Sequence, residues 1–304
     1  MRVLLAGATG ILGEPLVRRL MAAGHDVVGM GRSEQGARRL RDLGSQPLLA
    51  DVMDRDALLA AVRGERFDAV IHELTALKKP PARHADMRPT NALRIDGTAH
   101  LLDAARATGA TRFVTQSIVF GYGYRDLGTR ALTEDDPFGI PQGDAFDEHL
   151  AAMASTERQT ISAAGIEGIA LRYGLFYGAD LDNMAGMLRR RTLPVVTRGG
   201  EIPFVHHDDA ASATVAALER GEAGGIYNIV DDTPATFSDL IREVAARRGT
   251  PRPLRVPRWA LQAATPYAAS LFGAVSMRVS NERARTRLEW EPRFASVREG
   301  VAAS

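Results

Sequence analysis

The chain begins with a short apolar run that leads into Gly7-Ala8-Thr9-Gly10-Ile11-Leu12-Gly13, and a helical pattern follows. This order of strand, glycine turn and helix is typical of a βαβ unit that binds a dinucleotide. One glycine allows the tight turn, a second lets the pyrophosphate approach the backbone, and a third lets the helix pack against the strand. Free N–H groups at the helix N-terminus favour an anion. We therefore expect a Rossmann-type site with these cofactor contacts: Gly7, Thr9, Gly10, Ile11, Leu12 and Gly13.

The first half of the chain alternates aliphatic runs with amphipathic helical stretches, which indicates parallel strands joined by helical crossovers. Strands are expected at 2–6, 26–30, 46–50, 69–72, 112–115 and 168–172. Later, a helix is expected near 208–220, a strand at 226–230, and helices from 237 onward. We predict an α/β protein with a doubly wound parallel sheet and a smaller C-terminal substrate lobe. The cofactor domain would comprise 1–172, with 206–231 returning to it, and the lobe 173–205 and 232–304.

The amino-acid composition excludes several kinds of site and partner. The 304 residues include no Cys and carry a net charge of +1, which excludes disulfides, Cys-ligated metals and a thiol nucleophile, and we expect no metal site. No signal-peptide or membrane-span pattern is present, so we expect a cytoplasmic protein without membrane contact. The densest basic cluster, 189–191, lacks interleaved aromatic residues and indicates a solvated helix end rather than a nucleic-acid surface. The expected partner is a small-molecule substrate, with monomer and homodimer both open.

The end of the second predicted strand indicates which cofactor is bound. An NAD-selective protein usually carries an acidic residue there for the ribose 2′-OH, but this chain has Arg32 and Ser33. Arg32 can bind a 2′-phosphate with two hydrogen bonds, so NADP (as NADPH) is favoured and NAD stays an alternative. Arg32 could instead only cap an exposed strand end. Asp51 is expected at the adenine, with an N-cap or turn role as its alternative.

Further segments support a family resemblance. Residues 171–178 (Leu-Arg-Tyr-Gly-Leu-Phe-Tyr-Gly) resemble the "lRpgnvYG" segment, and 204–209 (Phe-Val-His-His-Asp-Asp) the "fihvdD" segment, of extended short-chain dehydrogenases/reductases of the NAD(P)-dependent epimerase/dehydratase type. With the G-x-x-G-x-x-G turn and the tail at 279–292, the resemblance covers nearly the whole chain. It implies further cofactor contacts, with simple packing as the alternative for the aromatic ones: Val52, Leu74, Thr75, Ala76, Gln116, Tyr173, Gly174 and Phe176.

The chain departs from that family at its catalytic residues. Members use a hydroxyl residue together with a Tyr-x-x-x-Lys pair, but no Tyr-x-x-x-Lys occurs between residues 139 and 168. Alignment places His149 at the tyrosine and Met153 at the lysine, while Arg94 replaces the Asn of the "N-x-x-G-T" segment. The expected hydroxyl is Ser117, although an ungapped count places Gln116 there.

These substitutions favour carbonyl reduction. Histidine titrates near pH ~6.5 without a neighbouring cation, so His149 could donate a proton while Ser117 stabilises the alkoxide. His149 could equally be a surface helix residue. Tyr122, Tyr124 and Tyr177 are other possible donors, and the apolar run 258–272 would either wall the substrate or belong to the core.

Oxidation of an alcohol needs a good base, whereas reduction of a ketone needs only a weak acid. We predict an NADPH-dependent ketoreductase of a small aromatic or polyketide-like substrate, similar to the atypical family members that act in antibiotic biosynthesis. The alternatives are a sugar-nucleotide epimerase or dehydratase with unorthodox residues and a non-catalytic NADP sensor or scaffold.

Overall fold

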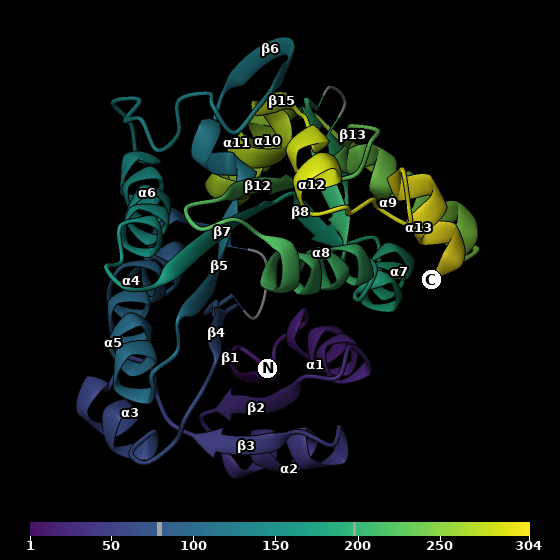
Figure 1. The fold of residues 1–304 in the computed structure, drawn as a ribbon. Helices are drawn as coiled ribbons and strands as arrows, with labels where there is room; N and C mark the ends of the chain where they lie inside the picture. Colours follow the sequence, from purple (N-terminus) through teal and green to yellow (C-terminus); the bar gives the residue numbers. More distant parts are fainter. Residues whose placement is uncertain (78–80, 197–198) are drawn as a thin grey trace.

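The computed structural model describes residues 1–77, 81–196 and 199–304 (Figure 1). Its centre is a sheet of seven parallel strands in the order β12-β7-β5-β4-β1-β2-β3. The strands are β1 (Arg2–Ala6), β2 (Asp26–Gly31), β3 (Gln46–Leu49), β4 (Ala69–His72), β5 (Arg112–Ile118), β7 (Glu167–Tyr173) and β12 (Ile226–Ile229). The strand order reverses beside β1, which is the doubly wound Rossmann arrangement. The predicted fold class is confirmed.

Both faces of the sheet are covered, which explains why its strands are apolar at consecutive positions. Along β1, Val3 and Leu5 belong to one core and Leu4 and Ala6 to the other. The first face packs against α1 (Gly13–Ala22), α2 (Glu34–Asp42) and α8 (His207–Arg220). The second packs against α3 (Arg55–Ala61), α5 (Thr98–Thr108) and α6 (Asp147–Ile161). Figure 1 shows these two helix layers on opposite sides of the strands.

The rest of the chain forms a lobe of short paired strands and helices above the carboxyl ends of the sheet (Figure 1). The strand pairs are β6 (Asp126–Leu132) with β15 (Ser276–Val279), β8 (Leu175–Tyr177) with β11 (Phe204–His206), β9 (Val195–Val196) with β14 (Arg255–Val256), and β10 (Glu201–Ile202) with β13 (Ala235–Thr236). The helices are α7 (Leu181–Arg189), α9 (Phe237–Arg247), α10 (Arg258–Ala264), α11 (Pro266–Gly273), α12 (Glu282–Arg287) and α13 (Val297–Ala303). The division into two domains at the predicted boundaries stays a prediction.

The structure differs from the sequence-based expectation at several places. β5 continues three residues beyond the expected end at 115, which carries Gln116 and Ser117 into the strand. The short paired strands of the lobe were not expected. Among them, β6 consists mostly of exposed residues, and no apolar alternation marks it. Within the described parts of the chain, no helix has the length and apolarity that crossing a bilayer requires.

Candidate cofactor and substrate site

The glycine turn has the geometry that a bound pyrophosphate needs. Gly7 has a φ of +99°, and a Cβ there would lie 2.6 Å from the carbonyl oxygen of Glu73. A Cβ on Gly13 would lie 2.3 Å from the carbonyl oxygen of Gly7, so only glycine lets α1 begin this close to the turn. Gly10 is exposed, and the neighbouring Ile11 exposes 61% of its surface although it is apolar. The turn therefore presents open backbone and an apolar side chain beside the N-terminus of α1, and it fits a dinucleotide.

The ends of β2 and β3 form the next part of the site. The guanidinium of Arg32 is largely exposed, with Nη1 3.8 Å from Oδ2 of Asp51. The Ser33 hydroxyl accepts the N–H of Gly36 and caps α2, and Oδ1 of Asp51 accepts the N–H of Met53 in a turn. Asp51 thus makes the turn contact that was its alternative role, and Ser33 caps α2, whereas Arg32 keeps donors free for an anion.

The ends of β4 and β5 are tied together by Gln116. Its Nε2 donates to the carbonyl oxygen of Leu74. Thr75 and Ala76, which follow Leu74, contact Thr90. The Thr90 hydroxyl lies 3.5 Å from that of Thr75 and accepts the N–H of Ala76 at 3.2 Å. Ligands of open parallel sheets bind at the carboxyl ends of the strands, so these residues lie where a cofactor is expected. Val52 is buried nearby, and its carbonyl oxygen lies 2.7 Å from Nδ1 of His100.

Ser117 points away from this edge. Its buried hydroxyl donates to Oε1 of Glu157 at 2.6 Å, and both oxygens of Glu157 are bound by the guanidinium of Arg172 at 2.9 and 2.8 Å. Neighbouring side chains of a strand face opposite sides, so Gln116 and Ser117 do not reach the same site. This arrangement argues against Ser117 as the group that stabilises an alkoxide and favours Gln116, the residue that the ungapped alignment places there.

His149 lies in the first turn of α6 and is fully buried, so the surface alternative for it is wrong. Its Nδ1 lies 2.8 Å from Nδ2 of Asn91, and its Nε2 lies 3.0 Å from Nδ1 of His84. Burial lowers the pKa of His149 to about 4. The imidazole is therefore neutral near pH 7 and can donate only from an uncharged N–H.

Aromatic rings surround this histidine. We define the aromatic cluster as His84, Tyr124, Phe146, His149 and Tyr267, whose ring centroids lie 4.1 to 6.4 Å apart. Tyr267 comes from α11, so the apolar run at 258–272 supplies one wall of this cluster. The hydroxyls of Tyr124 and Tyr267 lie 3.4 Å apart. Burial raises the pKa of each phenol.

In the described part of the chain, no lysine takes the place of the cation in the family pattern. Met153 is buried one turn after His149. Arg94 is buried as well and lies in a π-helical turn, η2 (Leu93–Gly97), that follows α4 (Arg88–Ala92). Sequence comparison marks Arg94 as unusual, but its burial could not be predicted because it depends on packing between distant segments.

The aromatic residues that follow β7 occupy the interior. Tyr173 is buried and donates to Oε1 of Glu73 at 3.0 Å, and its hydroxyl lies 2.7 Å from that of Thr214. Burial raises the pKa of Glu73 to about 8, so this carboxyl is protonated near neutrality. Phe176 is half-buried and stacks on His207 with ring centroids 5.3 Å apart. The structure thus places the Tyr173 phenol in a buried hydrogen-bonded group rather than at an open pocket.

Two other tyrosines that were possible proton donors form hydrogen bonds within the protein. Gly174, a further predicted contact, packs against the backbone of Phe204. The Tyr122 hydroxyl donates to Oδ1 of Asn228 at 2.8 Å, and that of Tyr177 donates to the carbonyl oxygen of Ser296 at 3.1 Å. A Cβ on Gly174 would lie 2.8 Å from the backbone of Phe204. Of the three tyrosines, Tyr124 alone belongs to the aromatic cluster.

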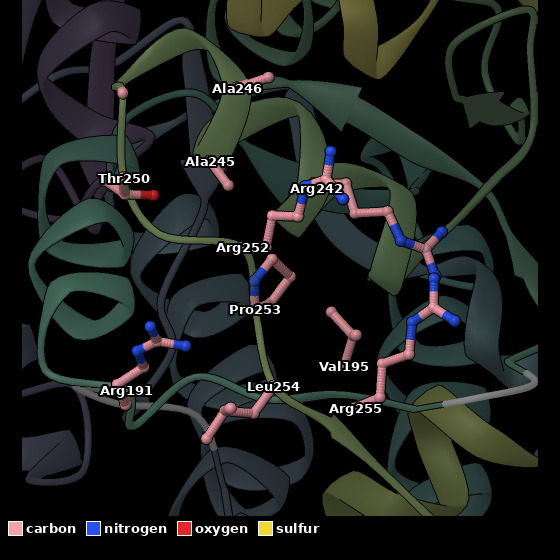
Figure 2. A pocket seen from close by; sticks show the side chains of 11 residues that line it. Arg191, Val195, Arg242, Ala245, Ala246, Thr250, Arg252, Pro253, Leu254 and Arg255 are labelled. Atoms are coloured by element: carbon pink, nitrogen blue, oxygen red, sulfur yellow. The ribbon is translucent and has the colours of Figure 1, made fainter.

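A separate pocket of about 810 Å³ lies in the C-terminal lobe (Figure 2). Arg191, Arg242, Arg252 and Arg255 line it, and Figure 2 shows Arg242 and Arg255 approaching each other on one side with Arg191 opposite. All four arginines are exposed, and Arg191 belongs to the basic cluster 189–191 at the end of α7, for which a solvated helix end was expected. None of the described residues at the carboxyl ends of the seven-stranded sheet lines this pocket, so the pocket does not belong to the candidate site.

A doubly wound sheet with an open glycine turn and a polar strand edge defines a dinucleotide-binding protein of the Rossmann class. The chain belongs to the NAD dependent epimerase/dehydratase family, whose model matches residues 3–230. It is 36% identical to a 3-diazoavenalumate denitrifying reductase from Streptomyces sp over 99% of both chains.

Two further comparisons agree with this family. A 4-hydroxy-2-methyl-3-oxo-4-farnesyl-3,4-dihydroquinoline-1-oxide ketoreductase from Stigmatella aurantiaca is 26% identical over 90% of this chain and 82% of its own. The structure of the UDP-glucose 4-epimerase from Thermus thermophilus in complex with NAD has a TM-score of 0.78 and 22% identity, over 99% of this chain and 97% of that one, which shows the shared fold. The protein is therefore an oxidoreductase, and a nicotinamide cofactor is supported.

Proposed function

We propose that this protein is an NADPH-dependent reductase that delivers hydride to the carbonyl carbon of a small aromatic or polyketide-like substrate. The observation that carries the proposal is that His149 and Met153, which alignment predicts at the positions of the tyrosine and lysine, are both buried, and that His149 is neutral. Such a site lacks the activated base that alcohol oxidation needs, but a weak donor suffices for reduction. The two named reductases among the relatives support this direction.

The choice of NADPH rests on Arg32. This guanidinium lies at the end of β2, is 65% exposed, and has only the 3.8 Å contact with Asp51 as an ion-pair partner among the described residues. A 2′-phosphate would offer it a bidentate, charge-assisted partner. NAD itself would offer Arg32 only a neutral 2′-hydroxyl at this place.

For the proton, we infer a relay through two histidines. His84 is half-buried and lies between solvent and the fully buried His149. Inward transfer takes the tautomer in which Nδ1–H of His84 donates to Nε2 of His149, and the proton on Nδ1 of His149 then passes to the carbonyl oxygen in place of the contact with Asn91. In this scheme the two imidazoles stay uncharged at rest and carry one proton inward for each carbonyl reduced.

A second candidate reaction is reductive loss of dinitrogen. The Streptomyces relative is named a denitrifying reductase of a diazo compound, and it matches this chain from end to end. With NADPH as the hydride source, an arenediazonium ion accepts one hydride at carbon, loses N2 and leaves the arene, and no proton is consumed. The absence of Tyr-x-x-x-Lys suits such a reaction, because no acid is needed.

The experiment that tests the proposal measures NADPH oxidation with two substrate panels. One contains simple and polycyclic ketones and the other contains substituted arenediazonium salts, with protein-free reactions as the control for uncatalysed reduction. Turnover of ketones supports the first reaction, and turnover of diazonium salts alone supports the second. If neither panel accelerates NADPH oxidation, the reductase proposal is refuted and the sensor alternative takes its place. Tightly retained NAD with binding of nucleotide sugars would instead indicate an epimerase or dehydratase.

A further inference from the structure

Arg94 is a buried cation without a counter-ion. Its side chain is 7% exposed, and its Nη1 is buried with no hydrogen-bond partner. Among the described residues, no carboxylate forms an ion pair with it. Its backbone is held firmly, since the carbonyl oxygen of Arg94 accepts the hydroxyls of Thr98 at 2.7 Å and Thr156 at 2.9 Å. The guanidinium is therefore fixed in the interior in a state that costs folding free energy.

The surroundings of Arg94 are those of the substrate site. The turn η2 packs against α6, which carries His149, and Asn91, one turn before Arg94, lies with its Nδ2 2.8 Å from Nδ1 of that imidazole. Arg94 therefore lies on a segment that contacts the aromatic cluster, and its charge acts on Tyr124 and Tyr267. The π-helical turn that carries it is a feature that is frequent at functional sites.

A second polar atom on the same segment also lacks a partner. Oδ1 of Asn91, one turn before Arg94, is buried without a hydrogen bond. Asn91 also contacts His149, because its Nδ2 lies 2.8 Å from Nδ1 of that imidazole. A bound ligand with several acceptor oxygens would satisfy Arg94 and reduce the cost of burying it.

We propose that Arg94, together with the hydroxyls of Tyr124 and Tyr267, binds a carboxylate of the substrate. A carboxylate has the planar pair of oxygens that a guanidinium binds bidentately, and the two phenols are donors that lie 3.4 Å apart. The aromatic cluster then accommodates the body of an aromatic acid. This inference rests on the proposed function, because it assigns a substrate class to the site where reduction occurs, and it can be tested without turnover.

The test compares an acid with its neutral analogue. Binding of trans-cinnamate and of trans-cinnamamide to the NADP-loaded protein is measured by calorimetry. Wild-type protein should bind cinnamate about tenfold more tightly than the amide or better, as a charge-assisted pair implies. Arg94→Asn, which introduces the family's residue, should abolish this preference, and Arg94→Lys should retain part of it. Arg88→Asn, an exposed arginine on α4, is the matched control and should behave as wild type.

A second measurement separates ligand binding from a structural role. Replacing an unpaired buried charge with an apolar side chain relieves its desolvation cost, so Arg94→Met should raise the melting temperature of the ligand-free protein. An arginine that holds the fold together would give a lower melting temperature. Equal affinities of wild type for acid and amide, failure to bind cinnamate, an unchanged preference in Arg94→Asn, or destabilisation by Arg94→Met would each overturn the proposal. Absence of NADPH turnover would refute the reductase function but would leave these binding results valid.

Discussion

Nε2 of His149 lies 3.0 Å from Nδ1 of His84, and the two rings are nearly parallel, with an interplanar angle of 7°. The pair joins a fully buried position on α6 to a half-buried residue of the segment that precedes α4. Alignment with the family pattern predicts that His149 stands at the position of the tyrosine. On that prediction, a neutral imidazole that is paired with a second one replaces a phenol activated by a cation.

If this pair carries the proton, its loss should affect carbonyl reduction. General acids contribute about 10²- to 10⁴-fold, so His149→Phe should lower kcat for a ketone by at least about tenfold, and His84→Phe by less. Hydride transfer to a diazonium ion needs no proton and should fall much less than ketone reduction in both variants. His25→Phe, just before the amino end of β2, serves as the control. Turnover of the ketone by His149→Phe at the wild-type rate would show that the proton comes from elsewhere.

Substitution of Ser117 should lower the free energy of unfolding, whereas substitution of Gln116 should lower activity. Removing the Ser117 hydroxyl leaves a buried carboxylate with one hydrogen bond fewer, so Ser117→Ala should lose about 1.5–3 kcal/mol of unfolding free energy with kcat nearly unchanged. Gln116→Ala should mainly reduce turnover or cofactor affinity. Urea unfolding and steady-state kinetics check both. The reverse result would restore Ser117 as the catalytic candidate.

Cofactor choice should depend on Arg32. We expect wild-type protein to bind NADPH more tightly than NADH, and Arg32→Ala to lose about tenfold or more in NADPH affinity while NADH binding changes little. Calorimetry with both nucleotides measures this, with the exposed Arg38→Ala on α2 as control. Equal affinities in the wild-type protein would remove the 2′-phosphate role.

Stability should rise as the pH falls from about 8 to 6.5. The pKa values of Glu73 and Asp231 are raised by burial to about 8, so the folded state binds two extra protons between pH 8 and their unfolded values near 4. Stability therefore rises as the pH falls from 8 to 6.5. Below pH 6.5 the unfolded state protonates three histidines, His72, His149 and His207, whose folded pKa values burial lowers to about 4.

Protonation of the histidines in the unfolded state opposes the gain from the buried acids, so the rise in stability should level off below pH 6.5. Melting temperatures between pH 5 and 9 check this profile. Glu73→Gln should flatten its alkaline side, because a neutral amide replaces the carboxyl that must ionise. A stability that increases steadily from pH 6.5 to 8.5 would contradict the assignment of buried, protonated acids.

The cofactor half of the site could be predicted from the sequence because its signals are local. A glycine turn between strand and helix and an arginine after β2 are each contained in a few residues, and the strands around them were predicted within a few residues of their ends. The substrate half of the site could not be predicted from the sequence. His149 contacts residues 58 and 65 positions away, and its burial follows from the packing of α6 against the segment that precedes α5. Sequence periodicity also did not define where β5 ends, so the sequence could not predict which side of the strand Gln116 faces.

The central claim is that this site transfers hydride without an activated tyrosine. The most direct measurement uses NADPH deuterated at C4 of the nicotinamide, incubated with the best ketone and the best diazonium salt from the two panels, followed by mass spectrometry of the product. We predict one deuterium on the carbon that carried the carbonyl or diazo group. Product without deuterium when either C4 position is labelled would contradict hydride transfer and the proposed reductase function.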